Sequence, residues 1–284
     1  MRFALVTPSF HLDFEICRIL IESVHRHVPR EVQHFIIVSG DDVGLFRGCG
    51  DERTHVIVQE DIVQERFFRV PFARRWRVNA RTLPVRGWIW QQMVKLSIAN
   101  RIDADAYMII DSDCFFVKDF DPRTLIVDGL VPFYREPKAW YETDDDTQTW
   151  AGVSRRLLGL PPLTKPYGVG YVNPWGLWRR DVLLKLQERV SGGHGQNAWL
   201  RRVARNLRFS EYALYGMYVD ELLGMERSGH YAFGRHMSLD YWGTTPLDGA
   251  ALAAMRGKLQ GEEIVMINAK SHTPVADIRW TFGY

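Results

Sequence analysis

The first part of the chain alternates short apolar runs with helical patterns. The runs FALVT, HFIIV and THVIV are rich in β-branched and aromatic residues and predict three strands. Between the first two, Ile16, Leu20 and Val24 recur every four residues, which predicts a helix over about 13–27. Residues 87–101 (GWIWQQMVKLSIANR) predict another helix, followed by the buried strand AYMII. Strands that alternate with helices favour an α/β fold with a mixed, mostly parallel sheet flanked by helices.

After about residue 125 the pattern becomes less regular. Segment 141–149 (YETDDDTQT) is typical of an exposed loop, and RDVLLKLQERV predicts a helix. Tryptophan and tyrosine are dense in this half. In YVNPWGLW, the side chains of Asn173, Trp175 and Trp178 could line a groove for a sugar, whose C–H faces stack on aromatic rings, or could belong to the core. We find no internal repeat and no linker.

The composition narrows the functional class. The 284 residues carry a formal net charge of +2, so no strong field favours nucleic acid as a partner. Three cysteines at unrelated spacings suit a reducing compartment better than a disulfide framework. No signal peptide and no apolar run of roughly 18 residues is visible. We therefore expect a cytoplasmic protein.

The stretch AYMIIDSDCFF places two carboxylates between apolar runs. Asp-x-Asp occurs four times, but only Asp111 and Asp113 lie between two predicted strands. On extended backbone their side chains would point to the same side and repel each other. A hard cation, Mg²⁺ or Mn²⁺, is the simplest partner for such a pair. The alternative is a pair of turn or capping aspartates.

The order of several motifs along the chain adds a resemblance to a known family. TPSF, GWIWQQMVKL, DSDCFF, SEYALYG and SHT follow one another in an arrangement that resembles the GT-A superfamily of glycosyltransferases, and in particular a little-characterised group of bacterial GT-A-like proteins. The resemblance is strongest over residues 87–116. It implies a GT-A-like (Rossmann-like) fold in one domain, residues 1–284. Residues 1–125 would bind the nucleotide sugar and residues 126–284 the acceptor.

The resemblance also implies a metal site. Asp111 and Asp113 match the metal-binding Asp-x-Asp of that superfamily, so Asp113 would act in catalysis. The metal would hold the diphosphate of the donor, a nucleotide-diphosphate sugar, beside Asp111 and Ser112. His272, in NAKSHTP, would complete the metal shell. The alternative for His272 is a surface or core histidine.

Further donor contacts are implied by the first loop and by the helix over residues 87–101. The loop after the first strand would line the nucleotide pocket through Thr7, Pro8 and Ser9. Gln92 and Lys95 share one polar side of the helix and could reach a phosphate or the sugar. A solvated helix face is the alternative.

An inverting transfer also needs a base for the acceptor hydroxyl. Glu211, in FSEYALYG, is the candidate, and Asp220 and Glu221 come next. The alternative for this segment is a helix that starts at Glu211 behind an N-capping Ser210.

The sequence thus predicts a metal-dependent glycosyltransferase that adds a sugar to a glycan or glycolipid acceptor, in bacterial surface polysaccharide synthesis. The alternatives are a nucleotidyltransferase and a non-catalytic glycan- or nucleotide-binding protein of the same fold. Peripheral contact with the inner face of the membrane is a further expectation, through basic residues at 201–208 beside Trp199 and Leu200. The pattern does not determine the donor, the acceptor or the oligomeric state.

Overall fold

The structure, a computed structural model, describes residues 1–70, 73–82, 84–195 and 197–284. The chain divides into two compact units that interleave along the sequence. The sheet unit consists of Phe3–Val58, Met108–Leu125 and Arg235–Tyr284, and the helical unit of Met1–Arg2, Gln59–Tyr107 and Ile126–Gly234. One boundary falls at residue 125, where the sequence analysis divides the chain, but residues 59–107 group with the second half.

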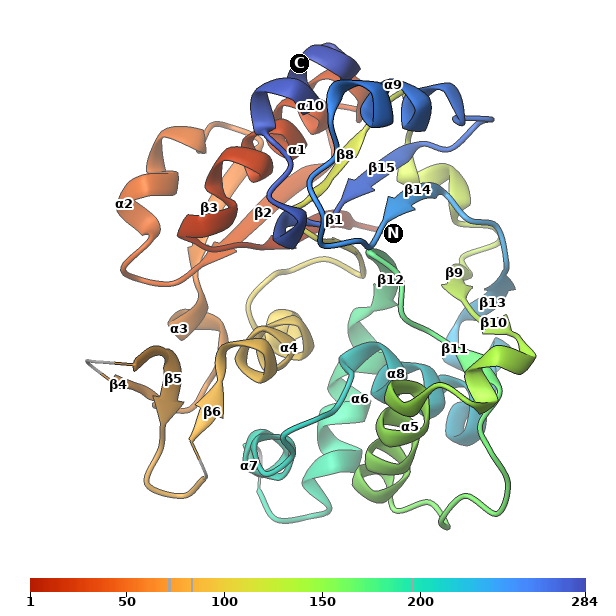
Figure 1. Ribbon diagram of the computed structural model, residues 1–284. Coiled ribbons are helices and arrows are strands. Elements are labelled where there is room, and N and C mark those ends of the chain that lie inside the picture. The colour runs from red at the N-terminus through yellow and green to blue at the C-terminus, as the bar shows by residue number, and fades with distance from the viewer. Residues whose placement is uncertain (71–72, 83, 196) are drawn as a thin grey trace. The chain divides into compact units, whose positions relative to one another are not determined.

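The sheet unit contains the parallel strands that the sequence predicts. Strands β1 (Phe3–Pro8), β2 (Gln33–Val38) and β3 (Thr54–Val58) pair in parallel, and β7 (Ala106–Ile110) lies on the other side of β1. Every residue of β1 and β7 is buried, as expected for strands covered on both faces. The chain therefore has the predicted mixed α/β fold, with a mostly parallel sheet flanked by helices (Figure 1).

Helix α1 (Phe14–His27) connects β1 to β2 and is buried on two sides. Its Cys17 and Ile21 pack in a cluster with β2 and with α2 (Val43–Phe46). Its Ile16 and Ile19 join a second cluster. That cluster also draws on β8 (Cys114–Phe116), β15 (Ile264–Ile267), α9 (Gly249–Gly257) and α10 (Val275–Phe282). Strand β15 pairs antiparallel with β8 and parallel with β14 (Ser238–Tyr241).

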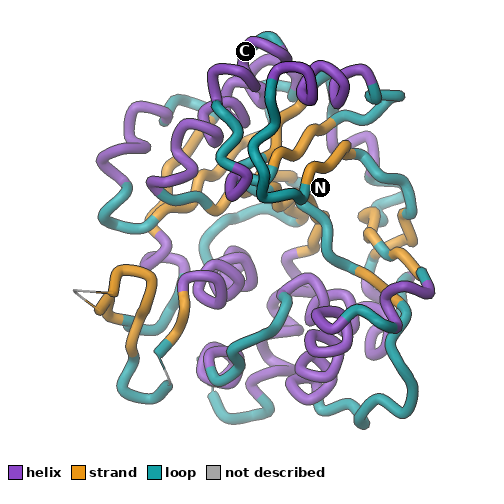
Figure 2. The backbone as a smooth tube through the Cα atoms, viewed as in Figure 1, coloured by secondary structure: helices purple, strands orange, loops and turns teal. Residues whose placement is uncertain are grey.

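The helical unit holds most of the α-helices of the described residues (Figure 2). They are α4 (Gly87–Ser97), α5 (Asp145–Leu158), α6 (Arg180–Ser191), α7 (Ala198–Ala204) and α8 (Glu211–Met217), with the short α3 (Gln59–Ile62) before them. Its strands are β4 (Phe68–Val70), β5 (Ala73–Val78), β6 (Val85–Arg86), β9 (Val131–Tyr134), β10 (Glu136–Pro137), β11 (Val169–Gly170), β12 (Trp175–Arg179) and β13 (His230–Phe233). The predicted helix at residues 87–101 is confirmed as α4, extended by a short 3₁₀ turn.

The loop predicted over residues 141–149 is wrong in its second half. Asp144 is the N-cap of α5, and its carboxylate accepts a hydrogen bond of 2.8 Å from the Thr147 backbone N–H. The acidic run therefore starts a helix, because carboxylates near a helix N-terminus satisfy its unpaired N–H groups and its dipole.

The aromatic residues of YVNPWGLW belong to the core and not to a groove. Trp175 is 1% exposed and Trp178 is 2% exposed, and the Trp178 ring stacks on Tyr215 at 4.9 Å. Asn173 is buried as well. The expectation that these three side chains line a sugar-binding groove is wrong, because the space that a sugar would need is filled by other rings.

His230 is a buried histidine that should make stability depend on pH. Its Nδ1 lies 3.0 Å from the Val131 carbonyl oxygen and its Nε2 lies 2.8 Å from the Tyr215 hydroxyl, an arrangement that suits a neutral ring. Burial lowers the pKa of His230 to about 4. Because this value lies below the ~6.5 of an unfolded histidine, the stabilisation is complete above about pH 6.5 and is lost as the pH falls toward 4.

A His230→Gln variant isolates this contribution, since glutamine does not protonate. The difference in unfolding free energy between wild type and variant should shrink by about 2 kcal/mol between pH 7.5 and pH 5. Urea denaturation of both proteins at the two pH values measures it. A difference that does not change with pH would contradict the neutral, buried ring.

Candidate functional site

The Asp-x-Asp motif lies in a turn of the sheet unit. Strand β7 ends at Ile110, and the Cys114 backbone N–H donates to the Asp111 carbonyl oxygen at 3.1 Å, which closes a four-residue turn before β8. The expectation of extended backbone at these positions is therefore wrong. The charges of Asp111 and Asp113 nevertheless act on each other, because the charge of Asp111 contributes to the raised pKa of Asp113.

Asp113 is anchored by the segment that follows β15. Its Oδ2 accepts a hydrogen bond of 2.9 Å from the Ala269 backbone N–H, and its own carbonyl oxygen accepts one from Ile267. Burial, and then the charge of Asp111, raise the pKa of Asp113 to about 7. This carboxylate is thus held where its negative charge is disfavoured, which is typical of a site that binds a cation.

Asp13 is a third carboxylate of this cluster, and the sequence pattern placed it only at the start of the helix predicted over about 13–27. It occupies the N-cap position of α1, but its side chain makes no capping hydrogen bond. Its Oδ2 instead accepts from the Ser112 hydroxyl at 3.0 Å. Burial raises the pKa of Asp13 to about 6, with the charge of Asp111 adding to the effect and that of Lys270 opposing it. Its place after the first strand, where ligands of α/β sheets bind, was the signal available in the sequence.

Two other parts of the predicted site are His272, the further metal ligand, and the loop from Thr7 to Ser9, which was expected to line the nucleotide pocket. His272 is exposed and left-handed, with φ 55°, and ends a 3₁₀ turn that begins at Ala269. Across the part of the chain that the structure describes, no three His, Cys, Asp or Glu side chains are grouped to hold a metal ion. Thr7, Pro8 and Ser9 are buried, with Thr7 Oγ1 at 2.9 Å from His34 Nε2, and the exposed part of the loop begins at Phe10.

The other predicted residues meet in the helical unit. Lys95 Nζ of α4 lies 3.0 Å from Glu211 Oε1 of α8, and both side chains are 6% exposed. Gln92 Oε1 accepts a 3.0 Å hydrogen bond from the Glu211 backbone N–H, and the Lys95 ammonium lies 4.9 Å from the centroid of the Tyr212 ring. The solvated helix face is therefore wrong: these polar groups are buried and bind one another.

The structure confirms the capping alternative for this segment. Ser210 is the N-cap of α8, and its hydroxyl accepts a hydrogen bond of 3.3 Å from the Ala213 backbone N–H. The cap fixes where α8 begins and so sets the position of Glu211.

Asp220 lies in a more accessible network of the helical unit. It belongs to a π-helix, Tyr218–Leu223, an irregular element that often marks functional sites. Its Oδ2 accepts from Arg135 Nε at 2.6 Å and from the Tyr171 hydroxyl at 2.7 Å, and Tyr171 in turn contacts the Tyr167 hydroxyl at 2.6 Å. Its neighbour Glu221 is ion-paired with Arg155.

The basic segment at residues 201–208 does not offer the membrane contact that the sequence suggested. Trp199 and Leu200 are 2% and 1% exposed, so neither can enter a bilayer. Arg201 pairs with Glu65, and Arg208 pairs with acidic residues at the start of α5. Among the described residues, no helix is both long and apolar enough to cross a membrane.

Comparison with known proteins assigns the chain to a family whose function is unknown. Residues 7–235 match a family described as a family of unknown function (DUF6492). No curated protein sequence matches. One solved structure that resembles the chain is the crystal structure of mouse Xyloside xylosyltransferase 1 in its apo form, at 11% sequence identity and a TM-score of 0.48. That match covers 96% of this chain and 100% of the other.

Proposed function

The chain belongs to DUF6492, a family of unknown function, and we propose from its site that it is a metal-dependent glycosyltransferase. In this proposal it moves a sugar from a nucleotide-diphosphate sugar to a glycan or glycolipid acceptor. Synthesis of bacterial surface polysaccharide on the cytoplasmic side of the membrane is the setting that the sequence resemblance suggests.

The observation that carries the proposal is the carboxylate cluster of Asp13, Asp111 and Asp113, in which burial and then the charge of Asp111 raise the pKa of Asp13 and of Asp113, although among the described residues the three side chains are not grouped to hold one ion together. The three residues follow β1 and β7, which are neighbours in the sheet, at the edge where α/β folds bind their ligands. Burial raises the pKa of both Asp13 and Asp113, so the cluster holds negative charge at a cost. A divalent cation would offset that cost, and carboxylate oxygens are the donors that Mg²⁺ and Mn²⁺ prefer.

Asp111 and Asp113 would hold the ion. When bound, such an ion neutralises the charge that develops on a diphosphate leaving group. The protein's own residues position Asp113 and its neighbour Asp13: the Ala269 N–H donates to Asp113, and the Ser112 hydroxyl donates to Asp13. With one Asp113 oxygen engaged by Ala269, the other oxygen is the one suited to the ion. His272 as a further ligand stays a prediction.

The roles of Thr7 to Ser9, Gln92, Lys95 and Glu211 also stay predictions. Glu211 is our candidate for the base that deprotonates the acceptor hydroxyl. Its Oε1 lies 3.0 Å from Lys95 Nζ, so this ion pair would have to open before the carboxylate could reach an acceptor hydroxyl.

Calorimetric titration of UDP, GDP and TDP into the protein, with Mn²⁺ and separately with EDTA, tests the proposal. We expect one nucleotide to bind in Mn²⁺ and to lose about 100-fold in affinity in EDTA. A nucleotide that binds equally well in EDTA would favour a metal-independent nucleotide-binding protein. If none of the three binds, the aspartates are structural and the proposal fails.

A further inference from the structure

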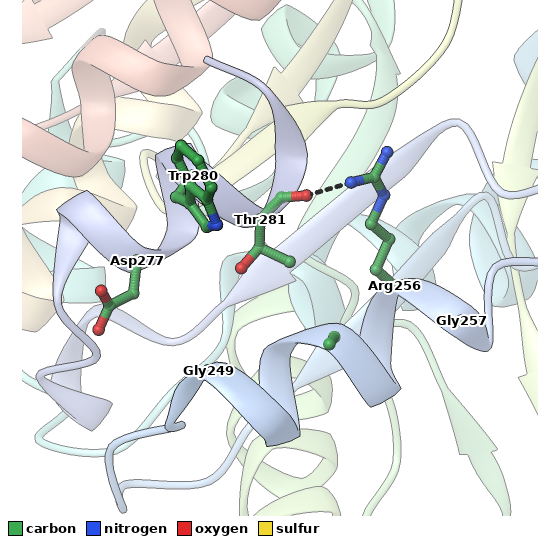
Figure 3. A pocket seen from close by; sticks show the side chains of 7 residues that line it. Gly249, Arg256, Gly257, Asp277, Trp280 and Thr281 are labelled. Atoms are coloured by element: carbon green, nitrogen blue, oxygen red, sulfur yellow. Dashed lines mark hydrogen bonds between the residues drawn. The ribbon is translucent and has the colours of Figure 1, made fainter.

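A cavity lies within the sheet unit, between α9 and α10 (Figure 3). Its volume is about 610 Å³, within the range of about 300–1,000 Å³ that is usual for small-molecule sites. The lining residues are Gly249, Ala253, Arg256, Gly257, Asp277, Trp280 and Thr281. None of them belongs to the carboxylate cluster, so the cavity is a separate feature of this unit.

One wall of the cavity is an exposed indole. Trp280 is 89% exposed, the highest value among the large hydrophobic side chains of the described residues. Ile278, on the opposite face of the same helix, is fully buried in the core cluster. Helix α10 is therefore anchored by Ile278 and presents Trp280 outward, and a flat apolar ring kept in water is a platform for a ligand with an apolar face.

Facing this wall, α9 offers three small residues at a spacing of four. Gly249, Ala253 and Gly257 lie on one side of the helix. Neither glycine has a left-handed backbone, and a Cβ added to either would meet no atom within 4 Å. The fold itself thus does not require glycine at these positions. Their small size instead keeps the space beside Trp280 open.

Polar residues also line the cavity. Asp277 and Thr281 lie three residues before and one after Trp280 on α10, and Arg256 Nη1 donates a hydrogen bond of 2.5 Å to the Thr281 carbonyl oxygen. That bond holds the guanidinium beside the cavity (Figure 3). Among the described residues, Asp277 and Arg256 form no ion pair with each other, although both line the cavity. Donors and acceptors are therefore available on both sides of the aromatic ring.

We propose that this cavity is a binding subsite for a neutral saccharide. A pyranose ring has one face of C–H groups, which stacks on an indole, and a rim of hydroxyls, which can bond to a carboxylate and a guanidinium together. One carboxylate and one guanidinium balance in charge, which disfavours a phosphate or another strongly charged ligand. The proposal does not rest on glycosyl transfer, because a glycan-binding protein without catalysis would use the same subsite.

Nuclear magnetic resonance of ¹⁵N-labelled tryptophan side chains tests the subsite. Cellobiose, maltose and lactose are titrated in EDTA, so that neither metal nor nucleotide is needed and the outcome is independent of the proposed transferase activity. The indole signal that is missing in Trp280→Ala should shift and saturate with at least one disaccharide. The signal of Trp140, which is 54% exposed in the helical unit, should not move.

An Ala253→Phe variant fills the cavity from an exposed helix position and leaves Trp280 in place. It should keep the melting temperature and weaken saccharide binding by about tenfold. Binding that is unchanged in this variant, or a Trp280 signal that ignores all three disaccharides, overturns the proposal. A Trp280 signal that responds only to phosphatidylglycerol vesicles also overturns it and assigns the face to a membrane surface.

Discussion

Replacing Asp111 and Asp113 together by alanine should weaken nucleoside diphosphate binding in Mn²⁺ by about 100-fold or more. The two carboxylates are the donors that we assign to the metal, and without them the diphosphate loses its main electrostatic partner. Calorimetry in Mn²⁺ measures the loss, and the residual affinity should equal that of the wild type in EDTA. A double variant that binds as tightly as the wild type would contradict the site.

The chain provides a matched control for this experiment in another Asp-x-Asp triplet. Asp119 is exposed and pairs with His27, and Asp121 is partly buried and pairs with Arg123. Replacing these two by alanine removes the same charge from the same unit and should leave nucleotide binding unchanged. A comparable loss of affinity in this control would show that net charge, and not a specific metal site, carries the effect.

Loss of binding in the Asp111 and Asp113 variant should not come from unfolding. The folded-state pKa of Asp113 is raised to about 7, above the ~3.9 of an unfolded aspartate. The contribution of such a group to stability is complete below about pH 4 and is lost as the pH rises through about 7. At pH 8 in EDTA the variant should therefore be at least as stable as the wild type, which thermal denaturation can check.

Lys95→Met should cost about 3–5 kcal/mol of unfolding free energy, the second large effect that we expect. The substitution keeps the length of the side chain but removes the ammonium that pairs with Glu211 at 3.0 Å. Glu211 is then left as a buried carboxylate with only part of its hydrogen bonding, and desolvation is no longer offset. Urea denaturation at pH 7.5 measures the loss. A cost below about 1 kcal/mol would mean that the pair is solvated in solution.

A Glu211→Gln variant distinguishes the contribution of Glu211 to stability from its proposed role as a base. The amide is uncharged but similar in shape, so the double change Lys95→Met with Glu211→Gln should recover part of the stability lost in Lys95→Met alone. If Glu211 is the base, the single variant Glu211→Gln should stay folded and lose transferase activity by about 100-fold or more. Full activity in a folded Glu211→Gln protein would move the assignment to Asp220, the more exposed carboxylate.

The apolar patterns of the chain were sufficient to predict much of the fold. The runs that form β1 and β7 are largely apolar, as a strand buried on both faces requires, and those that form β2 and β3 are rich in β-branched residues. The spacing of four in α1 likewise marks the side that it buries. Such signals are local, because the periodicity of side chains follows directly from the backbone geometry.

The candidate site could be predicted only in part. The Asp-x-Asp motif stood out because charged residues directly after a buried strand are unusual. Asp13 did not stand out in the sequence, because an aspartate before a helix is usually a cap. Only the fold brings its Oδ2 to 3.0 Å from the Ser112 hydroxyl. The spacing of Gln92 and Lys95 on one side of α4 was read correctly, but whether that side faces water depends on α8, more than a hundred residues later.

The sequence by itself therefore determined β1, α1, β2, β3 and β7 of the sheet unit and singled out the pair Asp111 and Asp113. The tertiary structure alone decided which side chains are buried and which are exposed. The Lys95 and Glu211 pair and the aromatic core around Trp178 are buried, and Trp280 beside α9 is exposed. The physical reason is that periodicity depends on neighbours in the chain, whereas burial, ion pairing and pKa depend on neighbours in space. Those neighbours come from segments that no local pattern connects.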